Sequence, residues 1–190
     1  MDCEKKIKIV NAEKSDIDAI MKIENNSFES AIREKKDVFL SRIEVFQKGF
    51  LLLKVDGVTA GYFSSELWEK TPESESDFAS LFVGHSIKKT HCDNGKSLYV
   101  SSFAILPDFR AKGLAHTFFC EVLSLIKSDV GFSSAFLVVN PKWSRAVSIY
   151  KKEGFVEKRV LKRFFENGDD SIFMEKVFNK EIEMKLRGTK

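Results

Sequence analysis

Hydrophobic and polar residues alternate in several short segments of the chain, and this period of two predicts β-strands. Residues 50–55 and 58–67 are two such segments, and Asp56-Gly57 between them favours a tight two-residue hairpin turn. A third strand is predicted over residues 97–106, which Pro107 ends because proline cannot continue a strand ladder. The remaining predicted strands cover residues 5–10, 135–139, 155–165 and 171–178.

Other segments repeat their apolar residues every three or four positions, which is the spacing of an amphipathic helix. Residues 16–25 form one such helix, with Ser15 as its expected N-terminal cap, and residues 33–47 form a second. A fourth, over residues 142–153, is expected to end at Gly154. The third begins near Gly113, and its apolar stripe is expected to face the core: Leu114, Phe118, Val122, Leu125 and Ile126.

The segment from residue 68 to residue 96 follows neither period, apart from a short helix predicted near residues 78–83. A loop of this length inside a compact domain is usually functional or mobile. The chain contains no internal repeat, low-complexity tract or linker. We therefore expect one α/β domain over residues 1–178, followed by a polar tail at residues 179–190.

Composition excludes several classes of partner. The 31 Lys and Arg residues against 28 Asp and Glu leave a net charge of +3, and no basic block has interleaved aromatic residues, so we expect no nucleic-acid partner. The three cysteines are widely spaced without a CxxC pair, which favours a reducing compartment over a disulfide framework. With no signal-peptide pattern and no long apolar run, a cytoplasmic protein without a membrane partner is expected.

The turn at residues 110–115, Arg-Ala-Lys-Gly-Leu-Ala, lies between a predicted strand and a predicted helix. A helix N-terminus presents unpaired backbone N–H groups and partial positive charge, and together these suit a phosphate. Glycine allows the backbone to approach an anion closely. The residues expected to hold the anion are Arg110, Ala111, Lys112, Gly113, Leu114 and Ala115.

Downstream of this turn, Ala146-x3-Tyr150-x3-Gly154-Phe155 completes a more specific combination. Together the two motifs resemble the GNAT superfamily of acyl-CoA N-acyltransferases, whose phosphate-binding signature is Arg/Gln-x-x-Gly-x-Gly/Ala. The resemblance covers residues 5–178 and implies a mixed, mostly antiparallel, twisted sheet of about seven strands flanked by about four helices. It also implies acetyl-CoA as the acyl donor.

Two shorter stretches, residues 61–70 and 104–115, look similar to the arylalkylamine N-acetyltransferases. That group carries two histidines on the central strand, where this chain has Tyr99 and Ser101. The superfamily's common asparagine before the later helix is Trp143 here. These departures affect two expectations: which residues would remove the proton of the amine, and which amine is the acceptor.

For the donor, the resemblance implies that the pyrophosphate binds at residues 110–115. It also implies that the backbone of Phe103, Ala104 and Ile105 pairs with the pantetheine arm and that Tyr150 contacts the cofactor. A phenol with a pKa near ~10 can protonate a leaving thiolate of pKa ~8.5, which makes Tyr150 a candidate acid. The alternative is a buried aromatic residue whose hydroxyl is bonded to the backbone.

For the acceptor, an alkylamine of pKa ~10.4 costs about 4.6 kcal/mol to deprotonate at pH 7, so a base or water relay is useful. Glu66, near a strand end, is the first candidate base, and its alternative is a solvated residue. Glu24 is a second candidate that would instead line the amine site together with Phe28. Tyr99, Ser101 and Ser102 are candidates for a water chain.

His85, His91, Cys92 and Asp93 lie close in the sequence without completing a four-ligand spacing, so we expect a solvated loop and no metal. His116 is expected at the surface.

The combined hypothesis is N-acetylation of a primary amine of a small molecule, an arylalkylamine or polyamine, by direct attack in a ternary complex. A protein N-terminal amine acetyltransferase and a non-catalytic acyl-CoA-binding regulatory module remain alternatives. The oligomeric state stays open, with a homodimer among the options.

Overall fold

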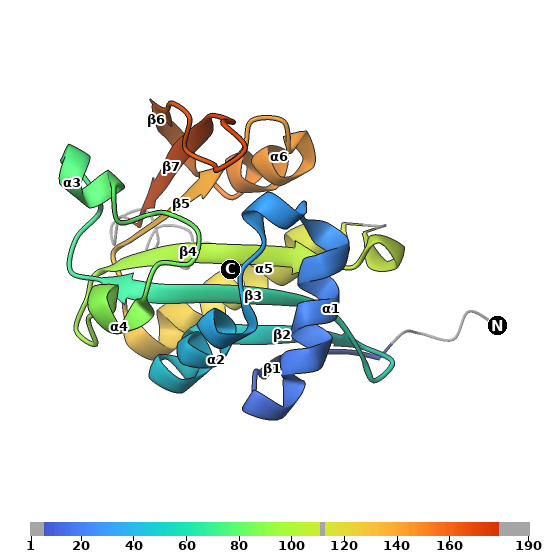
Figure 1. The fold of residues 1–190 in the computed structure, drawn as a ribbon. Helices are drawn as coiled ribbons and strands as arrows, with labels where there is room; N and C mark the ends of the chain where they lie inside the picture. Colours follow the sequence, from blue (N-terminus) through green and yellow to red (C-terminus); the bar gives the residue numbers. More distant parts are fainter. Residues whose placement is uncertain (1–5, 111–112, 179–190) are drawn as a thin grey trace.

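The computed structural model describes residues 6–110 and 113–178, and its seven strands form one sheet (Figure 1). The order across the sheet is β1-β2-β3-β4-β5-β7-β6. Neighbouring strands run antiparallel except β4 and β5, which confirms the mixed, mostly antiparallel sheet. The strands are β1 (Ile7–Asn11), β2 (Phe50–Val55), β3 (Val58–Trp68), β4 (Ser97–Ile105), β5 (Ser134–Val139), β6 (Val156–Leu161) and β7 (Ser171–Val177).

The β2–β3 hairpin follows from its turn residues. Asp56 and Gly57 both have positive φ, 50° and 84°, which matches the right-handed twist of the two strands. Along β2, Phe50 and Leu52 pack in one core cluster, whereas Leu51 and Leu53 pack in another. The strand is therefore buried on both faces, and helices must cover both sides of the sheet.

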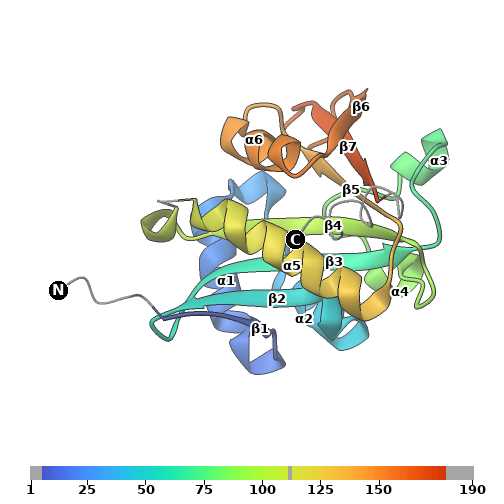
Figure 2. The ribbon, with the colours of Figure 1, turned by 180° about the vertical axis from the view of Figure 1, so that it is seen from behind.

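Helices cover the two faces separately, as Figures 1 and 2 show from opposite sides. The helices α1 and α2 lie on one face, and α5 crosses the other. Side chains of α5 share a core cluster with Tyr150 of α6, so these two helices belong to the same side. The described helices are α1 (Ile17–Ser27), α2 (Lys36–Val45), α3 (Glu75–Phe78), α4 (Ile87–Thr90), α5 (Leu114–Val130) and α6 (Ser144–Lys152).

The start of the first helix differs from the prediction. Ser15 is not its cap, because Lys14–Asp16 forms a 3-10 turn that precedes α1. In this turn the Asp16 carboxylate accepts a hydrogen bond from the backbone N–H of Glu13, at 3.0 Å, and closes a capping box. The second helix also starts later than expected, at Lys36.

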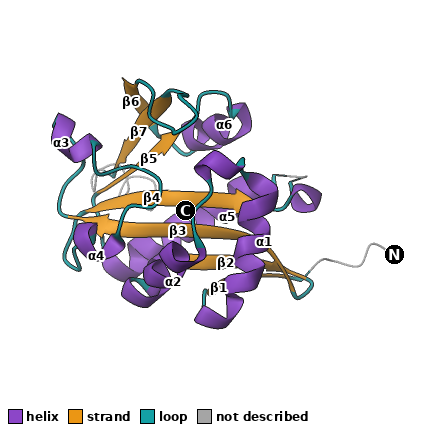
Figure 3. Ribbon diagram, in the orientation of Figure 1, coloured by secondary structure: helices purple, strands orange, loops and turns teal. Residues whose placement is uncertain are grey.

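Two further differences concern α5 and the irregular segment. Leu125, expected in the core, is 52% exposed, whereas Leu123 is buried in its place. In the segment from residue 68 to residue 96, a Ser74–Asp77 capping box starts α3 earlier than predicted, and α4 is an additional short helix (Figure 3). Among the described helices, none has both the length and the apolar character needed to cross a membrane.

Candidate active site

The main cavity of the described chain opens where β4 and β5 separate. Their parallel pairing covers three positions and ends at Tyr99 and Phe136. Beyond that point both strands border a cavity of about 720 Å³, β4 with residues 100–105 and β5 with residues 137–139. On its other side β4 stays paired with β3 as far as Ile105. The edge of β4 that faces the cavity therefore keeps backbone groups without a strand partner, as a ligand that pairs like a strand requires.

One end of the cavity lies at the N-terminus of α5. Gly113 caps the helix in the left-handed conformation, with φ of 77°, which favours glycine at this position. The first hydrogen bond within this turn runs from Thr117 N–H to the carbonyl of Gly113, so the N–H groups before Thr117 have no acceptor inside the helix. Gly113, Ala115 and His116 line the cavity, whereas Leu114 packs against the core. The anion site predicted from the sequence therefore borders the cavity.

Arg110 stabilises the same end of the cavity. Its Nε donates to the carbonyl of Ile105 at 2.7 Å, and its Nη2 donates to Ser27 Oγ at 3.1 Å. The guanidinium thus joins the end of β4 to α1 while also lining the cavity. The predicted positions Ala111 and Lys112 lie outside the described residues.

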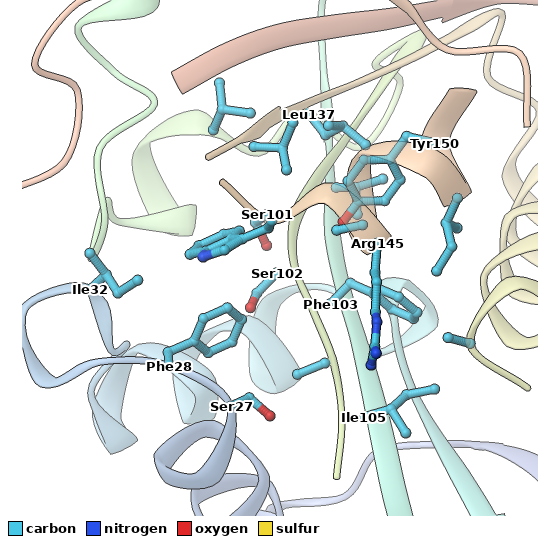
Figure 4. Close-up of a pocket in the computed structure, with 18 of the residues that line it drawn as sticks. Ser27, Phe28, Ile32, Ser101, Ser102, Phe103, Ile105, Leu137, Arg145 and Tyr150 are labelled. Atoms are coloured by element: carbon cyan, nitrogen blue, oxygen red, sulfur yellow. The ribbon is translucent and has the colours of Figure 1, made fainter. Parts of the chain in front are cut away.

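Further cations of α6 line this region. Arg145 and Lys152 both border the cavity, and neither forms an ion pair with any residue in 6–110 or 113–178. Figure 4 shows the Arg145 side chain at the cavity. Lys142 also borders it but is held by Asp169 at 2.6 Å. Two unpaired cations and a helix N-terminus fit the phosphates of coenzyme A. Sequence reasoning missed Arg145 and Lys152, because charged positions on an amphipathic helix ordinarily face solvent.

Tyr150 places its hydroxyl in the cavity near Arg145 (Figure 4). Its ring packs against Phe119 and Phe155, at 5.1 and 6.2 Å between centroids. Burial raises the pKa of Tyr150 above its usual value of 10, so the phenol stays protonated at neutral pH. No hydrogen-bond partner for this hydroxyl occurs within the described ranges, and the backbone-bonded alternative is therefore not what the structure contains. The hydroxyl is free to donate to a ligand.

The side of the cavity formed by α1 contains a buried carboxylate, Glu24. Glu24 is 1% exposed and accepts hydrogen bonds from the Tyr62 hydroxyl and from the backbone N–H of Glu34, the latter at 2.7 Å. Burial raises the pKa of Glu24 to about 7, although the Tyr62 and Glu34 hydrogen bonds oppose the shift. The Tyr62 oxygen also lies 2.7 Å from Ser102 Oγ. Since both Glu24 and Ser102 line the cavity, Ser102, Tyr62 and Glu24 form a continuous chain of proton-carrying groups.

An ion pair lies behind this chain. Arg42 is 1% exposed and its Nη2 donates to Glu34 Oε1 at 2.6 Å. Glu34 also lines the cavity, and its Oε2 has no partner among the described residues. Two carboxyl groups, Glu24 and Glu34, therefore lie on this side of the cavity, and Arg42 balances the charge of Glu34.

Glu66 does not border the cavity among the described residues. It is 1% exposed rather than solvated, and it accepts hydrogen bonds from Trp68 Nε1 at 2.7 Å, His85 Nε2 at 2.8 Å and Thr90 Oγ1 at 3.0 Å. Burial alone would raise its pKa, but the bonds from His85 and Trp68 outweigh burial and lower it. Glu66 therefore fastens the 85–90 region to β3.

The histidines of that region are not solvated either. His85 is 3% exposed, and His91 Nδ1 accepts from the backbone N–H of Leu67 at 3.2 Å. Of the four residues considered as metal ligands from the sequence, only Asp93 has a strongly exposed side chain, at 92%. These histidines stabilise the segment instead of forming a solvated loop.

The other residues singled out from the sequence lie together at the cavity. Phe28 contacts Trp143 at 5.4 Å between ring centroids, and Tyr99 stacks on Phe136 at 5.0 Å. The positions brought together on the lining are Phe28, Tyr99, Ser101, Ser102, Phe103, Ala104 and Ile105. Sequence reasoning did not identify the apolar wall formed by Ile32, Leu81, Phe82, Val83, Phe164 and Phe165, which comes from loops distant in the chain.

Comparison with known proteins agrees with this geometry. A family model described as an acetyltransferase (GNAT) domain matches residues 78–178. An N-alpha-acetyltransferase of Sulfurisphaera tokodaii is 27% identical over 171 residues, which are 90% of this chain and 92% of that protein.

Two solved structures share the fold. Ard1 from Thermoplasma volcanium has a TM-score of 0.71 at 18% identity, over 92% of this chain and 99% of its own. YncA from Salmonella typhimurium, solved with acetyl-CoA as its cofactor, has a TM-score of 0.66 at 18% identity, over 92% of this chain and 95% of its own. The family model spans more than half of the 190 residues, and the chain therefore belongs to the GNAT acetyltransferase family and is an acetyl-CoA-dependent acetyltransferase.

Proposed function

We propose that this protein transfers an acetyl group from acetyl-CoA to the α-amino group at the N-terminus of a polypeptide. The observation that carries the proposal is Glu24, a cavity-lining carboxylate with a pKa raised to about 7. An α-amino group has a pKa of about 7.7–8.0, so its deprotonation at pH 7 costs about 1 kcal/mol, against about 4.6 kcal/mol for an alkylamine. A base with a pKa near 7 is well matched to the proton of an α-ammonium group and poorly matched to the proton of an alkylammonium group.

The acceptor would lose its proton along the chain from Ser102 through Tyr62 to Glu24. Ser102 and Tyr62 are 2.7 Å apart, and Tyr62 is directly bonded to Glu24. In this proposal the role of base falls to Glu24 and not to Glu66, whose oxygens are occupied by His85, Trp68 and Thr90.

The donor would be held by backbone and cations. Acetyl-CoA supplies the acetyl thioester. The free edge of β4 at Phe103–Ile105 would bind its amide-bearing arm, and the N-terminus of α5 with Arg145 and Lys152 would bind its phosphates. Tyr150, protonated and without a partner in the described chain, would donate a proton to the leaving thiolate. No cysteine lies among the described lining residues, which supports direct attack by the amine.

The cavity walls support an apolar side chain next to the reacting amine. Phe28 and Trp143 form one wall, and Phe82, which is 54% exposed, lies on another. The 68–96 segment, which could close a peptide groove, borders the cavity only through residues 81–83 within the described part of the chain. The curated relatives named N-alpha-acetyltransferase, aligned over 84–90% of this chain, support the same class of acceptor.

A small arylalkylamine is the second candidate acceptor. The aromatic side chains at the cavity favour it, since Trp143 contacts both Phe28 and Phe165, at 5.4 and 5.7 Å between ring centroids. A flat aromatic amine could insert among them without the need for a peptide groove.

Thiol release from acetyl-CoA separates these candidates. The full-length protein is assayed with peptides that have a free N-terminus and a bulky apolar first residue, the same peptides with a blocked N-terminus and an internal lysine, arylalkylamines, and polyamines. We expect the highest kcat/KM with the free peptides and no turnover with the blocked ones. A higher kcat/KM for arylalkylamines would overturn the α-amine assignment, and acetyl-CoA binding without thiol release for any amine would indicate a regulatory module.

A further inference from the structure

A second group of ligand-type side chains comes from α5, the helix that crosses the sheet in Figure 2, and from the end of α6. His116 and Cys120 are one helical turn apart on α5, and Glu153 directly follows α6. Residues at i and i+4 project from the same side of a helix, so His116 and Cys120 face α6 together. The proposed acyl transfer uses none of these side chains. We refer to the three as the His116–Cys120–Glu153 cluster.

The three potential ligand atoms converge. Cys120 Sγ lies 3.5 Å from His116 Nε2 and 2.6 Å from Glu153 Oε1, and His116 Nε2 lies 3.7 Å from Glu153 Oε1. All three residues are partly buried, with side-chain exposures of 39% for His116 and 19% for Glu153. They are thus shielded enough to be held in place and open enough for an ion to enter.

The distances approach those of a tetrahedral zinc ion. Bonds of about 2.0–2.1 Å to nitrogen and oxygen and about 2.3 Å to sulfur place nitrogen and sulfur about 3.5 Å apart, and nitrogen and oxygen about 3.4 Å apart. The observed 3.5 Å and 3.7 Å are close to both values. For zinc to bind, the sulfur and oxygen must separate from 2.6 Å to about 3.5 Å, and the thiol must lose its proton because zinc binds the thiolate.

The charges around the cluster are compatible with a divalent cation. Without a metal the Cys120 thiol donates its proton to Glu153 Oε1. Lys176 contacts the other carboxylate oxygen, Oε2, at 3.3 Å and leaves Oε1 directed at the cluster. A bound thiolate and carboxylate would together neutralise an ion of charge +2.

We propose that His116 Nε2, Cys120 Sγ and Glu153 Oε1 bind one Zn²⁺ ion, with a water molecule as the fourth ligand. When the ion binds, the S–H bond of Cys120 breaks, its proton passes to solvent, and a zinc–sulfur bond forms. The site connects the first turn of α5 to the end of α6, and His116 also lines the donor cavity. This departs from the expectation of no metal, which considered only residues 85–93.

Cobalt(II) reports directly on such a site, because a cobalt–thiolate bond gives a charge-transfer absorption in the near ultraviolet. Full-length protein carrying Cys3→Ser and Cys92→Ser, so that Cys120 is the remaining cysteine, is titrated with Co²⁺ and then with Zn²⁺. We expect the band to saturate at one equivalent of Co²⁺ and to disappear when Zn²⁺ replaces it. In a direct titration the same protein should bind one equivalent of Zn²⁺.

Adding Cys120→Ser to this protein should abolish the band, and adding His116→Asn should weaken Zn²⁺ binding at least about 10-fold. Circular dichroism of each variant verifies that it is folded. A folded reference protein that shows no charge-transfer band, or Zn²⁺ affinity unchanged by Cys120→Ser, would refute the site. Neither measurement uses acyl transfer, so the metal site and the proposed function succeed or fail separately.

Discussion

Replacement of Glu24 by glutamine tests the buried carboxylate through the pH dependence of folding. In the folded protein the pKa of Glu24 rises from 4.5 to about 7, whereas the unfolded chain keeps the ordinary value. Between these pH values the folded state holds the extra proton, so stability falls as pH rises. The stabilising contribution is complete below about pH 4.5 and is lost above pH 7. At 1.36 kcal/mol for each pH unit, the loss amounts to about 3 kcal/mol.

Urea unfolding of the wild type and Glu24→Gln, followed by tryptophan fluorescence at several pH values from 4.5 to 8.5, measures this loss. Glutamine cannot ionise, so the stability of the variant relative to wild type should rise by about 3 kcal/mol across that range. Any lost hydrogen bond shifts the difference equally at every pH. Glu66→Gln is the matched control: because the pKa of Glu66 is lowered, its contribution to stability is lost only below about pH 4.5, and the difference between this variant and wild type should stay nearly constant from pH 4.5 to 8.5. A difference between Glu24→Gln and wild type that stays constant within about 0.5 kcal/mol would refute the reasoning.

Four further variants test the remaining parts of the site and the core. Tyr150→Phe should lower kcat about 100-fold or more with little change in acetyl-CoA affinity, because it removes only the proton donor; steady-state thiol release and calorimetric binding measure both. Arg145→Ala should weaken acetyl-CoA binding about 10-fold in calorimetry and leave kcat at saturating donor unchanged, since it removes a phosphate contact. Phe119→Ala should lower the free energy of unfolding by about 3–5 kcal/mol, because its fully buried ring packs against other aromatic residues, whereas the exposed Leu125→Ala should cost less than about 1 kcal/mol. Equal losses for the last two variants would contradict the observed packing of α5.

Much of the sheet could be predicted because its signals are local. The Asp56-Gly57 turn fixes the β2–β3 hairpin through two positive φ angles, and Gly113 marks the start of α5 in the same way. The prediction of Ser15 as the helix cap was wrong. The side chain that bonds to the turn before α1 is Asp16, which accepts a hydrogen bond from the backbone N–H of Glu13. The prediction that Leu125 lies in the core was wrong. The spacing of apolar residues along α5 allows either Leu123 or Leu125 to face the sheet, and in the structure it is Leu123 that is buried.

The hydrogen bonds around the two candidate bases could not be predicted, because they join distant parts of the chain. Glu24 meets Tyr62 across 38 positions, and Glu66 meets His85 and Thr90 across 19 and 24 positions. Both carboxylates are nearly free of solvent, so exposure does not distinguish them. The two carboxylates differ because residues 85–90 cover Glu66 and leave Glu24 at the cavity. No periodicity in the sequence shows that residues 85–90 fold back onto β3.

The separation of β4 from β5 has a consequence for how such a protein can diversify. Backbone N–H and C=O groups are present at nearly every position, so substitutions along β4 leave the donor-facing groups in place provided the two strands still diverge after Tyr99 and Phe136. The cavity walls proposed to contact the acceptor, in contrast, include side chains on loops, such as Phe28 and Phe82. Mutations there can alter the acceptor without loss of the donor. A few substitutions in the loops could therefore change which acceptor binds, while the backbone of β4 that is proposed to hold acetyl-CoA stays the same.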